Sequence, residues 1–318
     1  MKIMNHGVVV LLMLLLGLCL SPAYNTAALP ESSPLSSENK KASGENRKGG
    51  HIRITGLLDK LMDPESKERK LLEGASTVLS AAGDIDYESE RTIGESLALE
   101  GFRRYGMPVD NPELQQYVNL VGVAVARNSQ RPSIPYVFVV VDSPLQNAFS
   151  CPGGIIFISQ GLLTTIQDEA QLACILAHEV AHVGHKHALK SIKRARFFKG
   201  VGKITSATMA GEKGKQFESM IGDLQNILFD KGLDQNMEFE ADMSGMKTAY
   251  RTGYDPRGML QVLQRLRDIE AQSRKQGSWF STHPPLTERI KKCETQLNQY
   301  PDAAQLTHER DRFNARVR

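Results

Sequence analysis

Hydrophobic and polar positions divide the chain into an apolar start, a polar stretch and a long region with regular periodicity. Residues 8–20 form an apolar run of 13 residues. Residues 29–50 are rich in Ser, Pro, Glu, Lys, Asn and Gly and hold almost no apolar side chain. Apolar residues return from residue 56 at the spacings of helices and strands, which indicates a folded domain over about 56–300.

Within this region, helical segments flank a short strand-rich segment. Gly106 is a typical helix stop, and Pro112 suits the first turn of a helix. Residues 135–142, PYVFVVVD, are β-branched and aromatic, as in a strand, and Phe149 and residues 155–159 flank a Pro-Gly-Gly turn. The expected elements are helices over 87–105, 112–127 and 257–273, and strands over 135–142 and 155–159. This order predicts a mostly helical α+β fold with a small β-sheet.

The first 28 residues have the features of a secretory signal peptide. Lys2 and His6 precede the apolar run, which is too short for an ordinary membrane span, and small residues follow it. We therefore expect export to the periplasm, with an uncleaved membrane anchor as the alternative. A lipoprotein at Cys19 is disfavoured, because the bulky Leu18 stands where a small residue is required. Residues 29–55 are expected to be a disordered linker.

Composition and charge limit the classes of binding partner that the chain is expected to have. The net charge of +3, with 24% charged residues, suggests neither nucleic acid nor a strongly acidic partner. No stretch beyond residue 20 is apolar enough to span a membrane, so the mature chain should be soluble or peripheral. The basic run Lys186–Lys203 could contact an anionic membrane surface, although a solvated helix end, favoured by the helix dipole, is the preferred explanation. The sequence does not decide whether Cys151 and Cys293 form a disulfide. It does not indicate the oligomeric state either.

The candidate chemistry lies in residues 172–189, LACILAHEVAHVGHKHAL. His178 and His182 are four residues apart, so both imidazoles project from one face of a helix and can bind one zinc ion. Glu179 then lies beside the metal, where it can act as a general base on water. Asp168 and Gln171 form a capping-box pattern that opens this helix. The apolar surroundings predict a buried helix whose histidines need partners.

A catalytic zinc ion needs a third protein ligand. A histidine six residues after His182 would supply it in metzincins, but position 188 is Ala. The alternative is Glu238, with Asp242 four residues later on the same helical face to orient a ligand histidine. We expect Glu240 to be solvated and His187 to lie on the surface.

Three further segments give the chain a resemblance to a known family. Residues 238–245 read EFEADMSG, residues 147–155 read NAFSCPGGI, and residues 282–285 read THPP, followed by Arg289 and Ile290. With the HExxH run, these segments resemble metallopeptidase family 48, the gluzincin-type zinc endopeptidases that include HtpX, the CAAX prenyl proteases, the Oma-type enzymes and BepA. The resemblance covers residues 87–297. It implies a zincin-type fold in which the small sheet lies beside the HExxH helix.

The resemblance also assigns further site residues. It implies that Asn147, Ala148 and Phe149 lie beside the substrate cleft, although Asn147 could equally be a turn residue. It implies that His283 and Arg289 face the active site, where either could stabilise an oxyanion. His283 could instead fill the open position on zinc and hold the enzyme latent. Some relatives carry a helical-repeat domain after the peptidase unit, whereas residues 301–318 are expected here to be a short C-terminal tail.

The sequence therefore predicts a zinc metalloendopeptidase with one zinc ion per chain, acting on misfolded or envelope polypeptides. His178, His182 and Glu238 are the expected metal ligands, and Glu179 is the expected general base. Two alternatives stay open. One is a chaperone-like binding protein of envelope quality control with latent or little proteolysis. The other is a zinc enzyme of different chemistry, such as an aminopeptidase.

Overall fold

A computed structural model of the chain describes residues 85–198, 210–272, 283 and 286–318. The predicted signal peptide and linker lie outside the described residues, so they and the domain boundaries stay predictions. None of the helices in the described ranges is long and apolar enough to cross a membrane.

A three-stranded sheet holds the strands of the described residues, in the order β1-β3-β2. The bounds are β1 (Val137–Val141), β2 (Ala148–Cys151) and β3 (Ile155–Ser159). β1 pairs with β3 in parallel, whereas β2 and β3 are antiparallel and joined by the short 3-10 turn η1 (Pro152–Gly154). Gly153 has a φ of 82° in this turn, a conformation that favours glycine. β2 is therefore an edge strand of this sheet.

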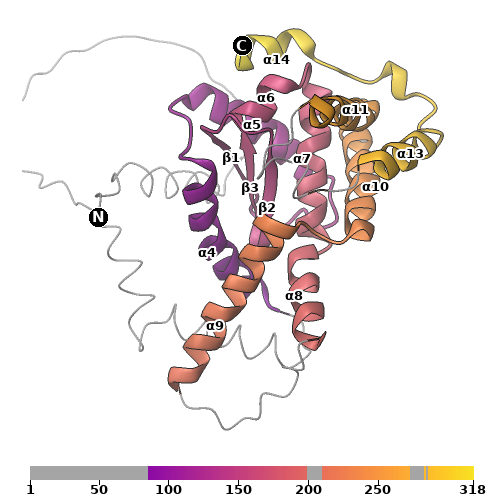
Figure 1. The fold of residues 1–318 in the computed structure, drawn as a ribbon. Coiled ribbons are helices and arrows are strands. Elements are labelled where there is room, and N and C mark those ends of the chain that lie inside the picture. The colour runs from indigo at the N-terminus through magenta and orange to yellow at the C-terminus, as the bar shows by residue number, and fades with distance from the viewer. Residues whose placement is uncertain (1–84, 199–209, 273–282, 284–285) are drawn as a thin grey trace, which may run out of the picture. The chain divides into compact units, whose positions relative to one another are not determined.

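The helices of the described residues are, in chain order, α4 (Tyr87–Tyr105), α5 (Pro112–Ala126), α6 (Gln160–Thr165), α7 (Glu169–Gly184), α8 (His187–Phe198), α9 (Ala210–Gln225), the π-helix η2 (Asn226–Lys231), α10 (Gln235–Thr252), α11 (Arg257–Gln272), α13 (Leu286–Leu297), the 3-10 helix η3 (Ala303–Gln305) and α14 (Arg310–Val317). In Figure 1, α4 and α7 lie on either side of the sheet, and α10 lies on the far side of α7. The expected mostly helical α+β fold with a small sheet is confirmed.

The helix boundaries follow from local sequence signals. α4 spans the predicted residues and ends at Gly106, whose φ of 97° is left-handed. At the start of α7, the Asp168 carboxylate accepts a hydrogen bond from the Gln171 backbone N–H at 2.9 Å. The Gln171 side chain accepts from the backbone N–H of Gln167, one residue before the position of a regular capping box. The predicted capping pair therefore does begin the zinc helix.

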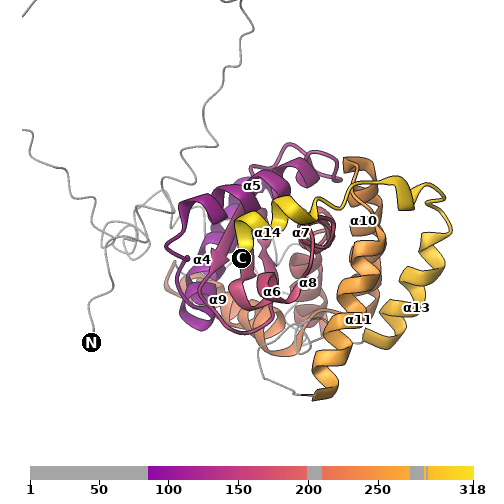
Figure 2. The same ribbon diagram turned by 90° about the horizontal axis from the view of Figure 1, so that it is seen from above.

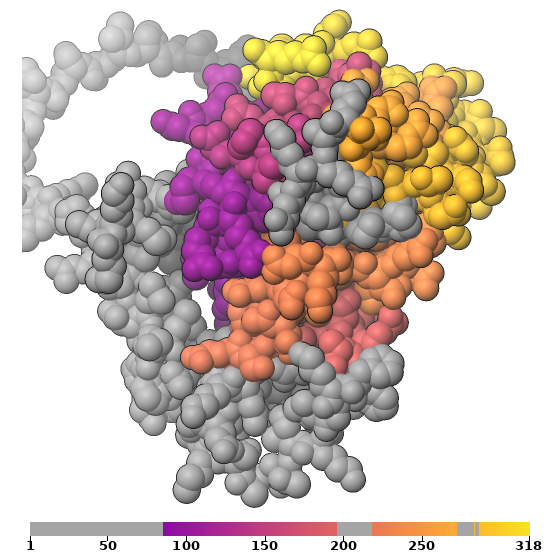
Figure 3. Space-filling view, viewed as in Figure 1, coloured from indigo at the N-terminus to yellow at the C-terminus, as the bar shows by residue number. Residues whose placement is uncertain are grey.

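α7 is the buried centre of the domain. Its apolar side chains, including Leu172, Ile175 and Val180, are fully buried. α7 packs against α5, α10 and α11, and Figure 2 shows α7 between α5 and α10 when the domain is viewed from above. In the space-filling view of Figure 3, α4 and α9 lie side by side on one face, as their contacts indicate. Functional side chains of α7 are thus held by a rigid core.

α14 closes the other end of α7. The Arg312 guanidinium donates hydrogen bonds to the buried Glu169 carboxylate, which also accepts from Tyr117 at 2.8 Å and Tyr254 at 2.6 Å. Phe313 is fully buried beside this cluster of hydrogen bonds. All described cysteines, Cys151, Cys174 and Cys293, are buried and free, so the bridge left open by the sequence does not form.

Candidate metal centre

Two packed helices bring the predicted metal ligands together. α7 supplies His178 and His182, and α10 supplies Glu238. The Nε2 atoms of His178 and His182 are 2.9 Å apart. The Glu238 carboxylate lies 3.6 Å from Nε2 of His178 and 3.5 Å from Nε2 of His182. All three side chains are buried, so the sequence-predicted ligand set is one cluster in the core.

The donor set fits a zinc ion. Bonds of about 2.0–2.2 Å in a tetrahedron place ligand atoms roughly 3.3–3.6 Å apart. The two distances to Glu238 fall in this range, and the two Nε2 atoms, 2.9 Å apart, are slightly closer. Oε1 of Glu238 has no hydrogen-bond partner within the part of the chain that the structure describes. A buried carboxylate oxygen without a partner is costly unless it binds a cation. A zinc ion held by His178, His182 and Glu238 would satisfy it.

Burial and charge set the ionisation of these ligands. Burial lowers the pKa of His182 well below its usual value, so this imidazole is neutral. Burial also acts to lower the pKa of His178, but the Asp242 and Glu238 carboxylates outweigh it and raise this pKa to about 9. For Glu238, the cationic neighbours outweigh burial and hold the pKa well below its usual value. The cluster therefore has a carboxylate and a neutral imidazole ready for a metal, and one proton to displace.

Asp242 lies behind His178. Its Oδ1 is 3.0 Å from Nδ1 of His178, on the opposite side of the ring from the metal position. Arg289 holds Asp242 with two hydrogen bonds of 2.7 Å each and donates a third, of 2.8 Å, to the backbone carbonyl of His283. Arg289 is completely buried. The sequence-predicted Arg289 thus contacts both Asp242 and, at 3.1 Å, the Glu238 carboxylate.

His182 is oriented by a different residue, His187, whose role the sequence did not indicate. Nδ1 of His187 lies 2.8 Å from Nδ1 of His182, and Nε2 of His187 lies 3.1 Å from Oε2 of Glu240. The expectation that His187 lies on the surface is wrong, since it is fully buried. α7 ends at Gly184, and Lys186 takes a left-handed φ of 56°, which turns His187 back toward the metal centre.

Glu240 differs from the expectation as well. Its side chain is 47% exposed, yet its carboxylate contacts His185 and His187 instead of being fully solvated. The H-x-H pattern directly after the HExxH run was the only available signal for this contact, and it is weak without the turn between α7 and α8. Glu240 and His187 together complete the surroundings of His182.

The Glu179 carboxylate lies beside the cluster of metal ligands and is not held by hydrogen bonds to the described residues. It is fully buried, and neither of its carboxylate oxygens has a hydrogen-bond partner within the described ranges. Nε2 of His283 is 3.6 Å from Oε1. Burial raises the pKa of Glu179, which makes its carboxylate a better proton acceptor. The group is available for proton transfer next to the metal position.

His283 reaches the centre from the segment before α13. Its Nδ1 is 2.9 Å from Oε2 of Glu238, and its Nε2 is 3.2 Å from the carbonyl oxygen of Ala148 on β2. Together with His178, His182 and Glu238, it forms a group whose potential ligand atoms lie within 4.8 Å of one another. His283 therefore stands where a fourth ligand or a substrate group would be.

The three residues of the segment Asn147–Phe149 have different surroundings. Ala148 contacts the centre through its carbonyl, as described above. Asn147 is buried and its backbone hydrogen-bonds to Ser159, at 2.9 and 3.0 Å. The Phe149 ring stacks on Phe157, with ring centroids 4.6 Å apart. Of the contacts described for these three residues, only that of the Ala148 backbone carbonyl is directed toward the metal position.

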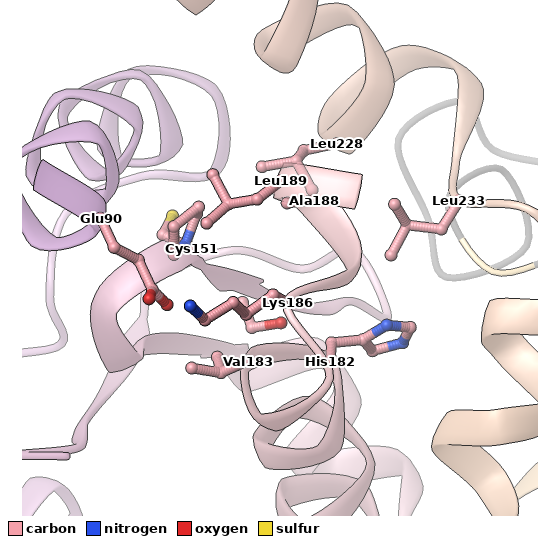
Figure 4. A pocket seen from close by; sticks show the side chains of 11 residues that line it. Glu90, Cys151, His182, Val183, Lys186, Ala188, Leu189, Leu228 and Leu233 are labelled. Carbon is pink, nitrogen blue, oxygen red and sulfur yellow. The ribbon is translucent and has the colours of Figure 1, made fainter. Parts of the chain in front are cut away.

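A small pocket adjoins His182 on the side of α8 (Figure 4). Its wall is largely apolar, with the Glu90 carboxylate and the Lys186 amine at one side. The lining residues are Glu90, Ser150, Cys151, Pro152, His182, Val183, Lys186, Ala188, Leu189, Leu228 and Leu233.

Comparisons with known proteins agree with this centre. Residues 112–297 match the model of peptidase family M48. The chain is 28% identical over 232 residues to the beta-barrel assembly-enhancing protease of Yersinia pestis, covering 69% of this chain and 46% of that protein. It is also 28% identical over 221 residues to the mitochondrial metalloendopeptidase OMA1 of Schizosaccharomyces pombe, covering 67% and 63%.

A third relative, the mitochondrial metalloendopeptidase OMA1 of Bos taurus, is 32% identical over 158 residues, covering 48% of this chain and 30% of that protein. The chain spans about half the length of the β-barrel assembly-enhancing proteases that it matches. The family match covers more than half of the chain and includes the HExxH helix and the helix that carries Glu238. The chain thus belongs to peptidase family M48, a family of zinc metallopeptidases.

Proposed function

We propose that this protein hydrolyses internal peptide bonds of polypeptides at a zinc ion held by His178, His182 and Glu238, with Glu179 as general base. The observation that carries the proposal is the buried cluster itself. It joins three zinc-type ligands to a carboxylate whose oxygens have no hydrogen-bond partner in the described part of the chain. The cluster also lies next to the backbone of an edge strand.

The zinc ion and the side chains around it have separate roles in the proposed hydrolysis. When bound, zinc polarises the scissile carbonyl and lowers the pKa of the attacking water. Glu179 accepts the proton of that water and later donates it to the leaving amine. Asp242, held by Arg289, fixes the orientation of His178 so that Nε2 points at the metal position. We therefore assign Arg289 a positioning role in preference to direct oxyanion stabilisation.

β2 is the proposed substrate-binding edge. Asn147 accepts a backbone hydrogen bond from β3. Backbone groups alternate along an antiparallel strand, so Ala148 and Ser150 direct theirs away from β3. An extended substrate can add to this edge through main-chain hydrogen bonds. Such binding tolerates many sequences, as a protease of unfolded polypeptides requires.

His283 occupies that edge in the structure. It contacts the Ala148 carbonyl and the Glu238 carboxylate at the same time. A substrate strand that pairs with Ala148 must displace this contact. We therefore favour a latent arrangement in which His283 withdraws before substrate binds, over a fixed oxyanion-stabilising role.

The proposed substrates are misfolded or envelope proteins. The support is the name of the β-barrel assembly-enhancing proteases among the relatives, together with the signal-peptide pattern of residues 1–28. Lys190 and Arg194 on α8 are basic and exposed. We therefore include a peripheral contact with anionic membranes in the proposal. A chaperone-like binding role with little proteolysis is the second candidate, supported by the position of His283.

Digestion of an unfolded polypeptide tests the proposal. The full chain is incubated with reduced casein, before and after chelation and after zinc is restored, and products are mapped by mass spectrometry. We expect internal fragments that disappear on chelation and return with zinc. Release of single N-terminal residues would indicate an aminopeptidase instead. If wild type and His283→Ala both suppress aggregation of the casein and neither cleaves it, the result would favour the chaperone-like binding protein.

A further inference from the structure

A second cluster of potential metal ligands lies beside the first. It consists of His185, His187 and Glu240, whose potential ligand atoms lie within 4.8 Å of one another. Nδ1 of His185 is 3.0 Å from Oε1 of Glu240, and Nε2 of His187 is 3.1 Å from Oε2. The two imidazole rings are nearly parallel, with an angle of 8° between their planes. Both rings therefore present a nitrogen to the same carboxylate.

This spacing suits a transition-metal ion. Nitrogen and oxygen ligands at about 2.0–2.2 Å from a tetrahedral ion are roughly 3.3–3.6 Å apart. The two nitrogen-to-carboxylate distances, 3.0 and 3.1 Å, are within a few tenths of an ångström of this range, and the whole set of ligand atoms lies within 4.8 Å of one another. Ser244 Oγ lies 2.8 Å from the remaining nitrogen of His185 and can accept its hydrogen when Nδ1 binds a cation. The exposed Glu240 side chain leaves room for water as a further ligand.

We propose that His185, His187 and Glu240 bind a second divalent cation of the zinc type, separate from the catalytic ion and more weakly held. Two imidazoles and one carboxylate are the donors that zinc prefers over magnesium or calcium. The site opens to solvent through Glu240, whereas the catalytic cluster is buried.

The contact between His182 and His187 couples the two sites. Their Nδ1 atoms are 2.8 Å apart, so one hydrogen lies between them. A neutral His182 that binds metal through Nε2 carries its hydrogen on Nδ1, and His187 then keeps its own hydrogen on Nε2, toward Glu240. A second cation has to displace that hydrogen. It therefore binds more weakly than the first ion and disturbs the hydrogen bond that orients His182.

Metal binding by the full chain tests this site without reference to proteolysis. Zinc is added to metal-free protein in equilibrium dialysis, and bound zinc is measured by mass spectrometry of the metal. Wild type is compared with His185→Ala, Glu240→Gln and, as a control histidine outside both clusters, His308→Ala. Far-UV circular dichroism checks that each variant is folded. His185 is only 11% exposed, so the folding check matters most for His185→Ala.

We expect two equivalents for wild type and for His308→Ala, the second at least tenfold weaker, and one for His185→Ala and Glu240→Gln. Excess zinc should inhibit casein cleavage by wild type and leave His185→Ala unaffected. A single equivalent in wild type would overturn the proposal, as would a second one that persists in both cluster variants. Because the first equivalent depends on Glu238 and not on His185, failure of this site leaves the proposed peptidase function standing.

Discussion

At Gly245, α10 packs closely against the backbone of the metal ligand His178 on α7. A Cβ at this position of α10 would lie 3.0 Å from the backbone nitrogen of His178 and 3.2 Å from its Cα. Ordinary contacts begin at 3.4 Å, so Gly245→Ala must separate α7 from α10 by roughly 0.4 Å. Metal sites tolerate ligand displacements of only about 0.2 Å. The substitution should therefore weaken the pairing of His178 with Glu238.

The magnitude follows from two opposing effects. Overpacking costs about 1–3 kcal/mol, while replacing a helical glycine by alanine contributes up to about 1 kcal/mol of stability. We expect Gly245→Ala to lower the free energy of unfolding of the metal-free protein by about 1 kcal/mol. Zinc affinity should fall about tenfold or more, which corresponds to about 1.4 kcal/mol. Urea unfolding and competition with a zinc chelator measure the two quantities.

Gly222 provides a matched control. It is exposed in α9, and a Cβ there would meet nothing within 4 Å. Gly222→Ala should therefore stabilise the protein by about 0.5–1 kcal/mol and leave zinc affinity unchanged. The reasoning is refuted if Gly245→Ala stabilises the protein as much as Gly222→Ala and binds zinc as tightly as wild type.

Three further predictions concern the centre and its support. His283→Ala should raise basal casein cleavage, because it frees the Ala148 carbonyl for substrate; a loss of activity would favour the oxyanion role. Zinc binding must displace a proton from His178, whose pKa is raised to about 9, so zinc affinity measured by chelator competition should rise about tenfold per pH unit from pH 6 toward 9; a flat profile would contradict this. Glu169→Gln should lower the free energy of unfolding by about 2 kcal/mol at pH 7 in urea, because the buried carboxylate loses its charged contact with Arg312. Since the pKa of Glu169 is lowered in the folded state, its contribution is present above the unfolded pKa, and the difference from wild type should shrink as the pH falls through the folded value; a constant difference would count against this.

The sequence predicted those features that depend on local spacing. α4 begins and ends at the predicted residues, because a capping Asp86 and a left-handed Gly106 define both ends. The pairing of His178 with His182 follows from helical geometry alone. Glu238 could be named from the sequence only as a candidate third ligand, through its pairing with Asp242 on one helical face, because its distance from α7 depends on how α10 packs.

The features that were missed depend on tertiary structure. His187 was expected on the surface, but α7 ends at Gly184 and the left-handed turn at Lys186 directs His187 into the core. Arg289 was expected to face the active site, and it does contact the Glu238 carboxylate at 3.1 Å, but its contacts with Asp242 and the His283 backbone could not be predicted from the sequence. No pattern in the sequence shows that a Cβ at position 245 would lie 3.0 Å from the backbone nitrogen of His178.

The most direct test of the account combines zinc content with proteolysis for wild type and Glu179→Gln. Both proteins are prepared identically, and zinc per chain and casein cleavage are measured on the same samples. Glu179 contributes no ligand, so both should hold zinc at the buried centre, and cleavage should occur in wild type and be lost in the variant by at least 100-fold, as expected for removal of a general base. Equal cleavage by both proteins, or no zinc in wild type under metal-replete conditions, would contradict the assignment of this cluster as the catalytic centre.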